Sequence, residues 1–282
     1  MIPFPFDYYR PATLQEAVAL FGELDAGGKR PLYYNGGTEI LTLGRMREVH
    51  TEAVIDVKRI PECRMLGRHA GMFVWGASLT LSEVHDAGLF PLLGKTGAGV
   101  ADRTSRNKIT LGGNICSQFI YKEAVLPLLV TDSLVRIVGP TGDRVAPIGQ
   151  LFDQTLRLGG GDLLVQAMTA TGYAELPYVT IKRRKSSAID YPLVTIAAIR
   201  TQEGMRFAFS GLCAFPFRSL EMEDILNNRE LPIAQRIQLA SAALPGPILN
   251  DIKGSALYRK HVWSVAMTEA MEALEKGASI GR

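Results

Sequence analysis

Two glycine-centred stretches, Asn35-Gly36-Gly37-Thr38-Glu39 and Thr110-Leu111-Gly112-Gly113-Asn114, decide how this chain is interpreted. Glycine permits a backbone turn with positive φ and lets main-chain N–H groups approach a ligand with no Cβ in the way. Successive N–H groups in such a turn form a concave site for a phosphate or diphosphate. One Gly-Gly step is more often an ordinary tight turn. Two of them, each next to apolar residues, predict two loops that close on one large anionic ligand.

The overall composition is that of an ordinary globular protein. The chain has 282 residues, 47% of them hydrophobic, and a formal net charge of +3. This length suits two domains, and the apolar content argues against disorder. We interpret the one basic run, Lys182-Arg183-Arg184-Lys185, as a solvated edge, because nucleic-acid binding needs a wider basic surface with aromatic platforms. We therefore expect no nucleic-acid partner.

Cysteine and histidine usage argues against a metal site. The 3 cysteines form no Cys-x-x-Cys pair, and the 4 histidines lack metal-ligand spacing, so zinc and iron–sulfur clusters have no ligands here. The N-terminal residues 1–7 lack the pattern of a signal peptide, and the densest apolar stretch, residues 124–130, is too short to cross a bilayer. We therefore expect a soluble, cytoplasmic protein without a membrane partner.

Local patterns predict the order of helices and strands. The capping boxes Thr13-Leu14-Gln15-Glu16 and Thr80-Leu81-Ser82-Glu83 each open a helix, the first running to about Leu24. Apolar runs predict strands over residues 32–34, 54–57, 72–76, 134–138, 163–169, 179–182, 194–199 and 207–212. Further helices are predicted from residue 218, over residues 233–243, and around residues 258–265. Because strands and helices do not alternate regularly, the predicted fold class is α+β.

The familiar nucleotide-binding motifs are absent. No Gly-x-Gly-x-x-Gly joins a first strand to a helix, and no P-loop sequence occurs. A dinucleotide held by two separated Gly-Gly loops is the remaining reading. The chain also offers no Ser/His/Asp or paired-carboxylate arrangement, so we do not expect hydrolysis.

Several segments resemble one family. Residues 35–40 resemble the Ala-Gly-Gly-Thr-Asp-Leu loop of the FAD-binding subunits of the xanthine dehydrogenase and carbon monoxide dehydrogenase family of molybdenum hydroxylases. Residues 106–115 are similar to that family's Arg-Asn-x-Ala-Thr-Ile-Gly-Gly-Asn, and residues 75–83 to its Gly-Ala-x-Thr-Thr segment. Residues 178–198 are similar to the start of its carboxy-terminal domain. The resemblance covers nearly the whole chain in order.

The resemblance implies a fold and a division into domains. A two-part FAD-binding domain of the vanillyl-alcohol-oxidase/PCMH type is expected over residues 1–174, with subdomains of about 1–56 and 57–174. A smaller α+β domain of the CO dehydrogenase flavoprotein type, a sheet plus helices, is expected over residues 175–282.

The resemblance also implies a function. The chain would be the FAD subunit of a complex, taking electrons from a 2Fe-2S small subunit and passing them to NAD or another acceptor, while a molybdenum-cofactor large subunit oxidises the substrate. The alternative is a free-standing flavin oxidoreductase, or a degenerate scaffold that no longer holds FAD. Dependence on partners separates these readings, because a true subunit should expose an apolar patch near the flavin edge.

The expected cofactor contacts follow from the matching motifs. No side chain is expected to be catalytic, because the flavin carries the chemistry. The first loop would bind the diphosphate through Gly36, Gly37 and Thr38, and the second would approach the ribityl chain and flavin, where a larger side chain would collide. The full set of expected FAD contacts is Asn35, Gly36, Gly37, Thr38, Glu39, Ile40, Thr110, Gly112, Gly113, Asn114, Glu123 and Lys182.

The segment after the second loop departs from the family pattern. Glu123 falls near a family Asp, with one more methylene of reach. Phe119 and Tyr121 could pack on the flavin or block one of its faces, and a core position for Tyr121 is equally open.

Four other residues could have either a structural or a functional role. Lys182 lies either beside the flavin or exposed at a strand end. Asp190 is expected to be structural, Trp75 to be core, and Cys116 to be a buried small residue rather than a reactive thiol.

Overall fold

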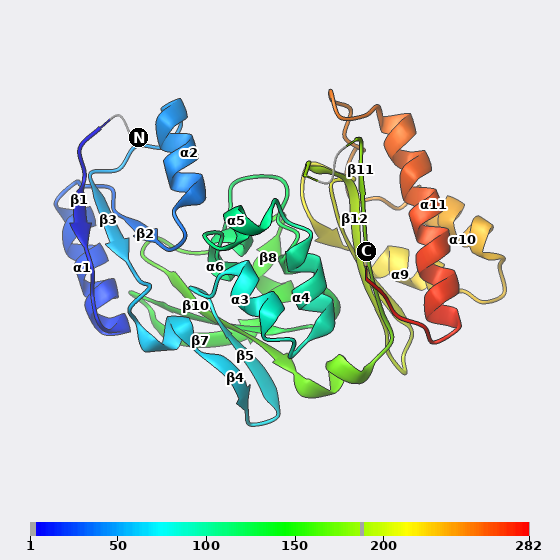
Figure 1. The fold of residues 1–282 in the computed structure, drawn as a ribbon, viewed down its shortest axis with the longest axis horizontal. Helices are drawn as coiled ribbons and strands as arrows, with labels where there is room; N and C mark the ends of the chain where they lie inside the picture. Colours follow the sequence, from blue (N-terminus) through cyan, green and yellow to red (C-terminus); the bar gives the residue numbers. More distant parts are fainter. Residues whose placement is uncertain (1–3, 187–188, 282) are drawn as a thin grey trace.

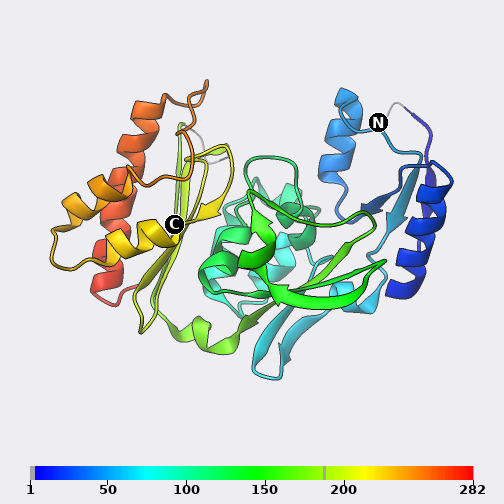
Figure 2. The same cartoon turned by 180° about the vertical axis from the view of Figure 1, so that it is seen from behind.

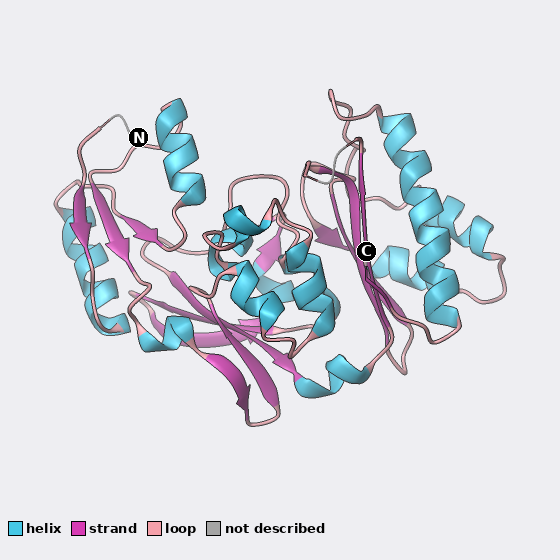
Figure 3. Cartoon of the chain, in the orientation of Figure 1, coloured by secondary structure: helices cyan, strands magenta, loops and turns pink. Residues whose placement is uncertain are grey.

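The computed structural model describes residues 4–186 and 189–281. Within these residues the chain forms one three-stranded sheet, two five-stranded sheets and a two-stranded ribbon. Figure 1 shows the three larger sheets side by side along the long axis of the molecule, in the order of the sequence. Figure 3 shows helices between and outside them, which gives an α+β architecture, as the sequence predicts.

The N-terminal sheet is parallel. It consists of β1 (Asp7–Tyr9), β2 (Leu32–Tyr34) and β3 (Ala53–Asp56) in the order β1-β3-β2. Helices α1 (Leu14–Ala26) and α2 (Thr38–Met46) lie in the two connections, so this part of the chain does alternate strand and helix. The sequence pattern does not indicate α2, because its N-cap is Gly37 rather than Ser, Thr, Asp or Asn.

The central sheet has the order β4-β5-β10-β6-β7, and its neighbouring strands are antiparallel. Its strands are β4 (Leu66–His69), β5 (Met72–Gly76), β6 (Leu134–Gly139), β7 (Gly142–Pro147) and β10 (Leu163–Ala170). The short 3-10 helix η1 (Pro61–Arg64) precedes β4, and the ribbon β8 (Phe152–Asp153) with β9 (Thr155–Leu156) precedes β10. The bounds of β5 agree with the predicted strand.

Short helices line the space between the two five-stranded sheets. They are α3 (Leu81–Asp86), α4 (Pro91–Ala98), α5 (Arg103–Arg106), α6 (Leu111–Ile115), α7 (Val125–Val130) and α8 (Ile148–Leu151). The predicted capping box at α3 is formed, since Thr80 Oγ1 accepts from the N–H of Glu83 and the Glu83 carboxylate accepts from the N–H of Thr80. The apolar stretch around residue 126 is the buried helix α7.

The C-terminal sheet has the order β14-β13-β12-β11-β15. Its strands are β11 (Tyr178–Arg184), β12 (Pro192–Arg200), β13 (Met205–Ser210), β14 (Phe217–Arg218) and β15 (Ile280–Gly281), and the 3-10 helix η2 (Thr171–Glu175) leads into it. Helices α9 (Leu220–Asn227), α10 (Ile233–Ala240) and α11 (Ala256–Glu275) cover its outer face, as Figure 2 shows from behind.

A shared hydrophobic cluster fixes the C-terminal sheet against the part of the molecule that holds the central sheet. Ala197, Ile199 and Ala208 on its inner face pack into the same buried cluster as Phe73 and Trp75 of the central sheet. A strand covered on both faces reads as a continuous apolar run, and eight consecutive residues of β12 are buried. Trp75 is fully buried, as expected.

Two predicted segments end earlier in the structure. The predicted strand over residues 207–212 ends at Ser210, because Gly211 turns the chain with φ of 81°. The helix predicted over residues 233–243 ends at Ala240. The helix predicted around residues 258–265 is present as part of α11, in which Trp263 and Ala270 are buried and Tyr258 and Val265 are exposed.

None of the helices in the described parts of the chain has both the length and the apolar character required to cross a membrane.

Candidate cofactor site

A cavity of about 1030 Å³ lies where the N-terminal part, the C-terminal sheet and the short helices α3 to α8, here called the helical layer, meet. Both Gly-Gly loops line it, so the loops that the sequence predicts to close on one ligand do lie together. All of the predicted cofactor contacts are on its wall: Asn35, Gly36, Gly37, Thr38, Glu39, Ile40, Thr110, Gly112, Gly113, Asn114, Glu123 and Lys182. Their role in holding the cofactor remains a prediction.

The first Gly-Gly loop delivers a helix N-terminus to the cavity. It connects β2 to α2, and Gly37, with φ of 71°, is the N-cap residue. Among the described residues no side chain caps this nine-residue helix, so its first main-chain N–H groups are available to an anion. A Cβ on Gly36 would lie 2.0 Å from the carbonyl oxygen of Lys108, so the two loops touch at this point.

Asn35 is held from two sides. The hydroxyl of Ser78 donates to its side-chain oxygen, and the ammonium of Lys58 donates to its carbonyl oxygen at 3.0 Å. Lys58 is itself paired with Asp56 at 2.9 Å. These contacts fix the entry to the first loop.

The second Gly-Gly loop is the start of α6. Thr110 caps this helix by accepting from the N–H of Gly113 at 3.2 Å, and the Asn114 side chain accepts from the N–H of Ala124 at 3.0 Å. A Cβ on Gly112 would lie 2.6 Å from the Cβ of Ala77. A side chain at this position would thus collide with the protein's own chain, and the expected collision with flavin stays a prediction.

Glu39 joins the two loops. Its carboxylate accepts a hydrogen bond from the Ser117 hydroxyl and one from the N–H of Gln118 at 2.7 Å. Its oxygens are thus engaged within the protein, and it shapes the cavity by tying the segment after the second loop to α2.

Glu123 and Lys182 form a buried ion pair across the junction between the helical layer and the C-terminal sheet. The Lys182 ammonium lies 2.7 Å from the Glu123 carboxylate and donates to the carbonyl oxygen of Gly99 at 2.8 Å. The Thr195 hydroxyl donates to the other Glu123 oxygen at 2.6 Å. Burial lowers the pKa of Lys182 from its usual value, and the negative charge of Glu123 opposes this shift.

The prediction that Lys182 is exposed is therefore wrong, and the solvated-edge interpretation of the basic run fails at this residue, while Arg183 and Arg184 are half-buried and Lys185 is exposed. Only 6% of the Lys182 side chain is accessible. Arg183 pairs with Glu269, and Arg184 donates to the Gly99 carbonyl oxygen at 2.9 Å. Local sequence could not indicate this, because the partners come from distant parts of the chain.

Aromatic side chains line the side of the cavity near the C-terminal sheet. Tyr121 stacks on Tyr191, with ring centroids 4.6 Å apart and an interplanar angle of 19°. Phe119, Ile189 and Tyr191 are exposed apolar residues on the cavity wall. The sequence analysis misses Tyr191, whose only local signal is its position next to Asp190.

Two smaller predictions have different outcomes. Asp190 pairs with Lys253, which agrees with a structural role. Cys116 is exposed on the cavity wall rather than buried, because it follows the last turn of α6 where the chain opens into the cavity.

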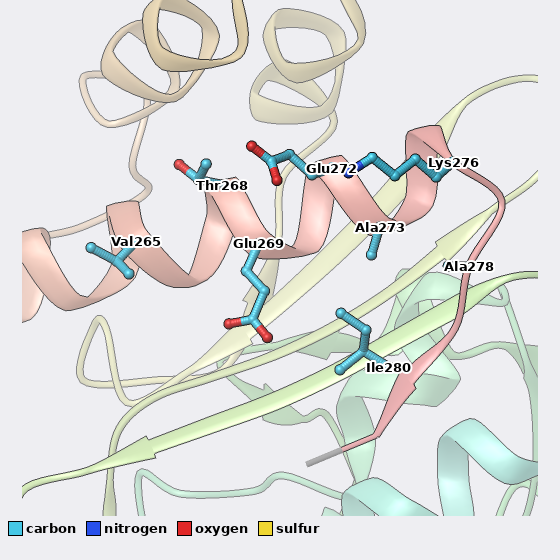
Figure 4. A pocket seen from close by; sticks show the side chains of 8 residues that line it. All are labelled: Val265, Thr268, Glu269, Glu272, Ala273, Lys276, Ala278 and Ile280. Carbon is cyan, nitrogen blue, oxygen red and sulfur yellow. The ribbon is translucent and has the colours of Figure 1, made fainter.

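A second, shallower cleft of about 570 Å³ lies on the far side of the C-terminal sheet, between α11 and β15. Figure 4 shows that side chains such as Glu269, Ala273 and Ile280 border it. None of the predicted cofactor contacts is on its wall, so it is not a candidate for the dinucleotide.

The sequence matches a known protein family and several curated proteins. The family described as "FAD binding domain in molybdopterin dehydrogenase" matches residues 4–168. The medium chain of carbon monoxide dehydrogenase from Hydrogenophaga pseudoflava is 32% identical over 157 residues, which cover 54% of this chain and 53% of that protein. The corresponding chain from Afipia carboxidovorans is 24% identical over 290 residues, which cover 96% and 97%.

Solved structures show the same fold. Carbon monoxide dehydrogenase from Hydrogenophaga pseudoflava superimposes with a TM-score of 0.87 at 24% identity, covering 99% of this chain and 100% of that one. Quinoline 2-oxidoreductase from Pseudomonas putida 86 does so with a TM-score of 0.85 at 23% identity, covering 99% of each chain. The chain therefore belongs to the FAD-binding family of the molybdopterin dehydrogenases, as an oxidoreductase subunit whose cofactor is FAD.

Proposed function

We propose that this chain is the flavin subunit of a molybdenum hydroxylase, which accepts electrons from a 2Fe-2S partner chain and passes them to NAD or another acceptor. The single observation that carries the proposal is the meeting of both Gly-Gly loops on one cavity of about 1030 Å³. Neither loop alone would indicate a dinucleotide.

The residues present fit FAD. The uncapped N-terminus of α2 at Gly37 offers main-chain donors to a diphosphate. The aromatic pair Tyr121 and Tyr191 offers a flat apolar surface for a ring system. When bound, FAD supplies the capacity to take up and release electrons, while the protein orients it and tunes its potential.

The proposed roles of the wall residues follow the two loops. Gly36, Gly37 and Thr38 hold the diphosphate through main-chain N–H groups and a hydroxyl. Thr110, Gly112, Gly113 and Asn114 form the wall beside the ribityl chain and flavin. Asn35, Glu39, Ile40 and Glu123 shape that wall.

Lys182 is proposed to favour the reduced cofactor. Two acceptors for its ammonium are recorded, on Glu123 and Gly99, and an ammonium has three hydrogens to donate. A remaining donor on the cavity wall would stabilise negative charge that develops on a neighbouring ring.

The division into domains is likewise a proposal. We propose an FAD-binding domain over residues 1–174, with subdomains of about 1–56 and 57–174, and a C-terminal domain over residues 175–282. The separate N-terminal, central and C-terminal sheets support it.

The proposed partners are a 2Fe-2S small subunit and a molybdenum-cofactor large subunit, with NAD as one possible acceptor and no nucleic acid or membrane involved. Relatives support a multi-subunit arrangement by name, including a "medium chain" and a "complex subunit alpha". Exposed Phe119, Ile189 and Tyr191 at the cavity supply apolar surface for a partner. The cytoplasmic location stays a prediction.

Anaerobic reoxidation of the chain tests the proposed electron path. The FAD-loaded chain is reduced with dithionite, freed of excess reductant, and mixed with NAD or with dioxygen. In a separate experiment the oxidised chain is mixed with a reduced 2Fe-2S protein, and bleaching of the flavin spectrum supports that protein as the electron donor. Rapid return of the oxidised flavin spectrum with NAD supports NAD as the acceptor. If dioxygen restores the spectrum and NAD does not, NAD is rejected as the acceptor. A chain that is reduced directly by a molybdenum hydroxylase substrate, with no partner present, would favour the free-standing oxidoreductase instead.

A further inference from the structure

The carboxylates on the cavity wall are all engaged within the protein. Each accepts a hydrogen bond from, or pairs with, another group of the chain: Glu39 with Gln118, Asp102 with Ser105, Glu123 with Lys182, Asp162 with Arg144, and Asp190 with Lys253. Glu123, Asp162 and Asp190 are paired with cations, whereas the hydrogen bonds to Glu39 and Asp102 come from neutral donors.

The lysines on the wall are not all compensated in this way. Lys182 and Lys253 are paired with carboxylates. Lys108 is exposed, and among residues 4–186 and 189–281 its ammonium has no hydrogen-bond acceptor. One lysine charge of the cavity thus remains for a ligand.

Lys108 sits where the two Gly-Gly loops meet. A Cβ on Gly36 would lie 2.0 Å from its carbonyl oxygen and 3.2 Å from the N–H nitrogen of Thr110. Its main chain is therefore in contact with the loop that carries Gly37, the N-cap of the open helix α2. An anion bound at that helix would lie close to the backbone of Lys108.

Neighbouring cations are already committed. Lys58 donates to the carbonyl oxygen of Asn35 and pairs with Asp56. Arg106 donates to the carbonyl oxygens of Val100 and Ala101 at 2.9 and 2.8 Å. Among the described residues, the ammonium of Lys108 has neither a carboxylate partner nor a carbonyl acceptor.

We propose that Lys108 is a diphosphate-binding residue, whose ammonium pairs with the two negatively charged phosphates of FAD beside the N-terminus of α2. This inference rests on the proposed function, since it assumes that the dinucleotide occupies this cavity. An ammonium is a compact charge on a flexible stem and suits a phosphate oxygen approached from solvent. Lys108 would thus contribute to affinity for the ADP half of the cofactor and not to the flavin ring.

Ligands with and without phosphates test this role. The full chain is stripped of flavin, and the dissociation constants of FAD, ADP and riboflavin are measured by calorimetric titration for wild type, K108A and K108R. Lys260, an exposed lysine on α11 away from the cavity, provides the matched control K260A. We expect K108A to bind FAD and ADP about tenfold more weakly, as for loss of one charge-assisted hydrogen bond.

The same variants carry three further expectations. Riboflavin affinity should not change in K108A, K108R should recover most of the loss, and K260A should match wild type. The FAD affinity of wild type should also fall more steeply with added salt than that of K108A, because the lost contact is screened by ions.

The outcomes separate the role of Lys108 from the function of the chain. Unchanged FAD and ADP affinity in K108A overturns the role while the flavin-subunit proposal stands. An equal loss for riboflavin also overturns it, because Lys108 would then act on the shape of the cavity. A wild-type chain that binds neither FAD nor ADP contradicts the proposed function itself, and with it any role of Lys108.

Discussion

Gly36 has no room for a side chain, and the reason lies within the protein. Its Cβ would fall 2.0 Å from the carbonyl oxygen of Lys108, so alanine must push the two loops apart. We expect G36A to lower the free energy of unfolding by about 2 kcal/mol, as overpacking does, and to weaken FAD binding as well. Gly22 in α1 is the matched control, since nothing lies within 4 Å of its Cβ position. G22A should raise stability by about 0.5–1 kcal/mol.

Urea denaturation of both glycine variants checks this pair. A G36A chain as stable as wild type contradicts the close approach of the loops. The sign of the difference between G36A and G22A is the informative result, because both changes add the same methyl group.

Glu39 is a positioning residue in this account, since its carboxylate accepts from Ser117 and Gln118. E39A should leave the Gln118 N–H without its acceptor and loosen the segment after the second loop, weakening FAD binding by about tenfold. E39Q keeps an acceptor for the N–H of Gln118 and should lose less FAD affinity than E39A. Glu48, exposed beyond the end of α2, supplies the control E48A. Fluorescence titration with FAD measures all three, and equal losses in E39A and E39Q would show that the charge matters rather than the tie.

At the scale of elements, Asp162 stabilises the turn that leads into β10. Its carboxylate accepts from Arg144 and from the N–H of Gly159 at 2.7 Å, and the hydrogen bond from Arg144 lowers the pKa of Asp162 from its usual value. Because the folded-state pKa is the lower one, this stabilisation is present above about pH 4, the unfolded value, and is lost as pH falls through the folded value.

Urea denaturation at several pH values tests whether the stabilisation by Asp162 is lost in acid. D162N should lower the free energy of unfolding at neutral pH by about 1–2 kcal/mol, and the gap to wild type should close in acid. Asp153 and Arg157 form an exposed pair nearby, with side chains 59% and 64% accessible, so D153N should have little effect. If the difference in free energy of unfolding between wild type and D162N is the same at acidic and neutral pH, the ion pair is not its source.

The pair Glu123 and Lys182 joins the helical layer to the C-terminal sheet through β11. Removing one partner leaves the other as an unpaired buried charge. E123Q and K182M should therefore each lower the free energy of unfolding by about 3–5 kcal/mol. The double variant E123Q/K182M should lose clearly less free energy of unfolding than the two single variants added together, because neither charge is then left unpaired. Chemical denaturation of the four chains gives the coupling, and additive costs would mean that the two groups do not interact.

Much of the element order could be predicted from sequence, because it depends on local signals. The capping box at Thr80 and the apolar run of β5 are complete within a few residues. Helix α2 could not, because glycine replaces the usual capping side chain. The burial of Lys182 and the contact of Gly36 with Lys108 depend on residues far along the chain, which no local pattern records. The meeting of the two Gly-Gly loops could be predicted from their residues, whereas the positions of Glu123 and Lys182 on the cavity wall followed only from the resemblance of whole motifs.

At the scale of the whole molecule, the cavity lies at the junction of parts that are far apart in sequence. The N-terminal loop at Gly37, the helical layer at Thr110 and the strand at Lys182 each contribute to its wall. A dinucleotide bound there would contact all three parts and stabilise their arrangement. We expect added FAD to raise the midpoint of thermal unfolding of the flavin-free chain, by mass action on the folded state. Riboflavin, which cannot reach the diphosphate end, should raise it less.

The central claim is that this cavity holds FAD, and one measurement tests it most directly. The chain is purified alone, its visible absorption spectrum is recorded, and mass spectrometry identifies whatever heat releases. The account predicts the bands of an oxidised flavin and FAD at about one per chain, either as purified or after incubation with FAD. A colourless chain that takes up no added FAD would contradict it and favour a scaffold that has kept the fold without the cofactor.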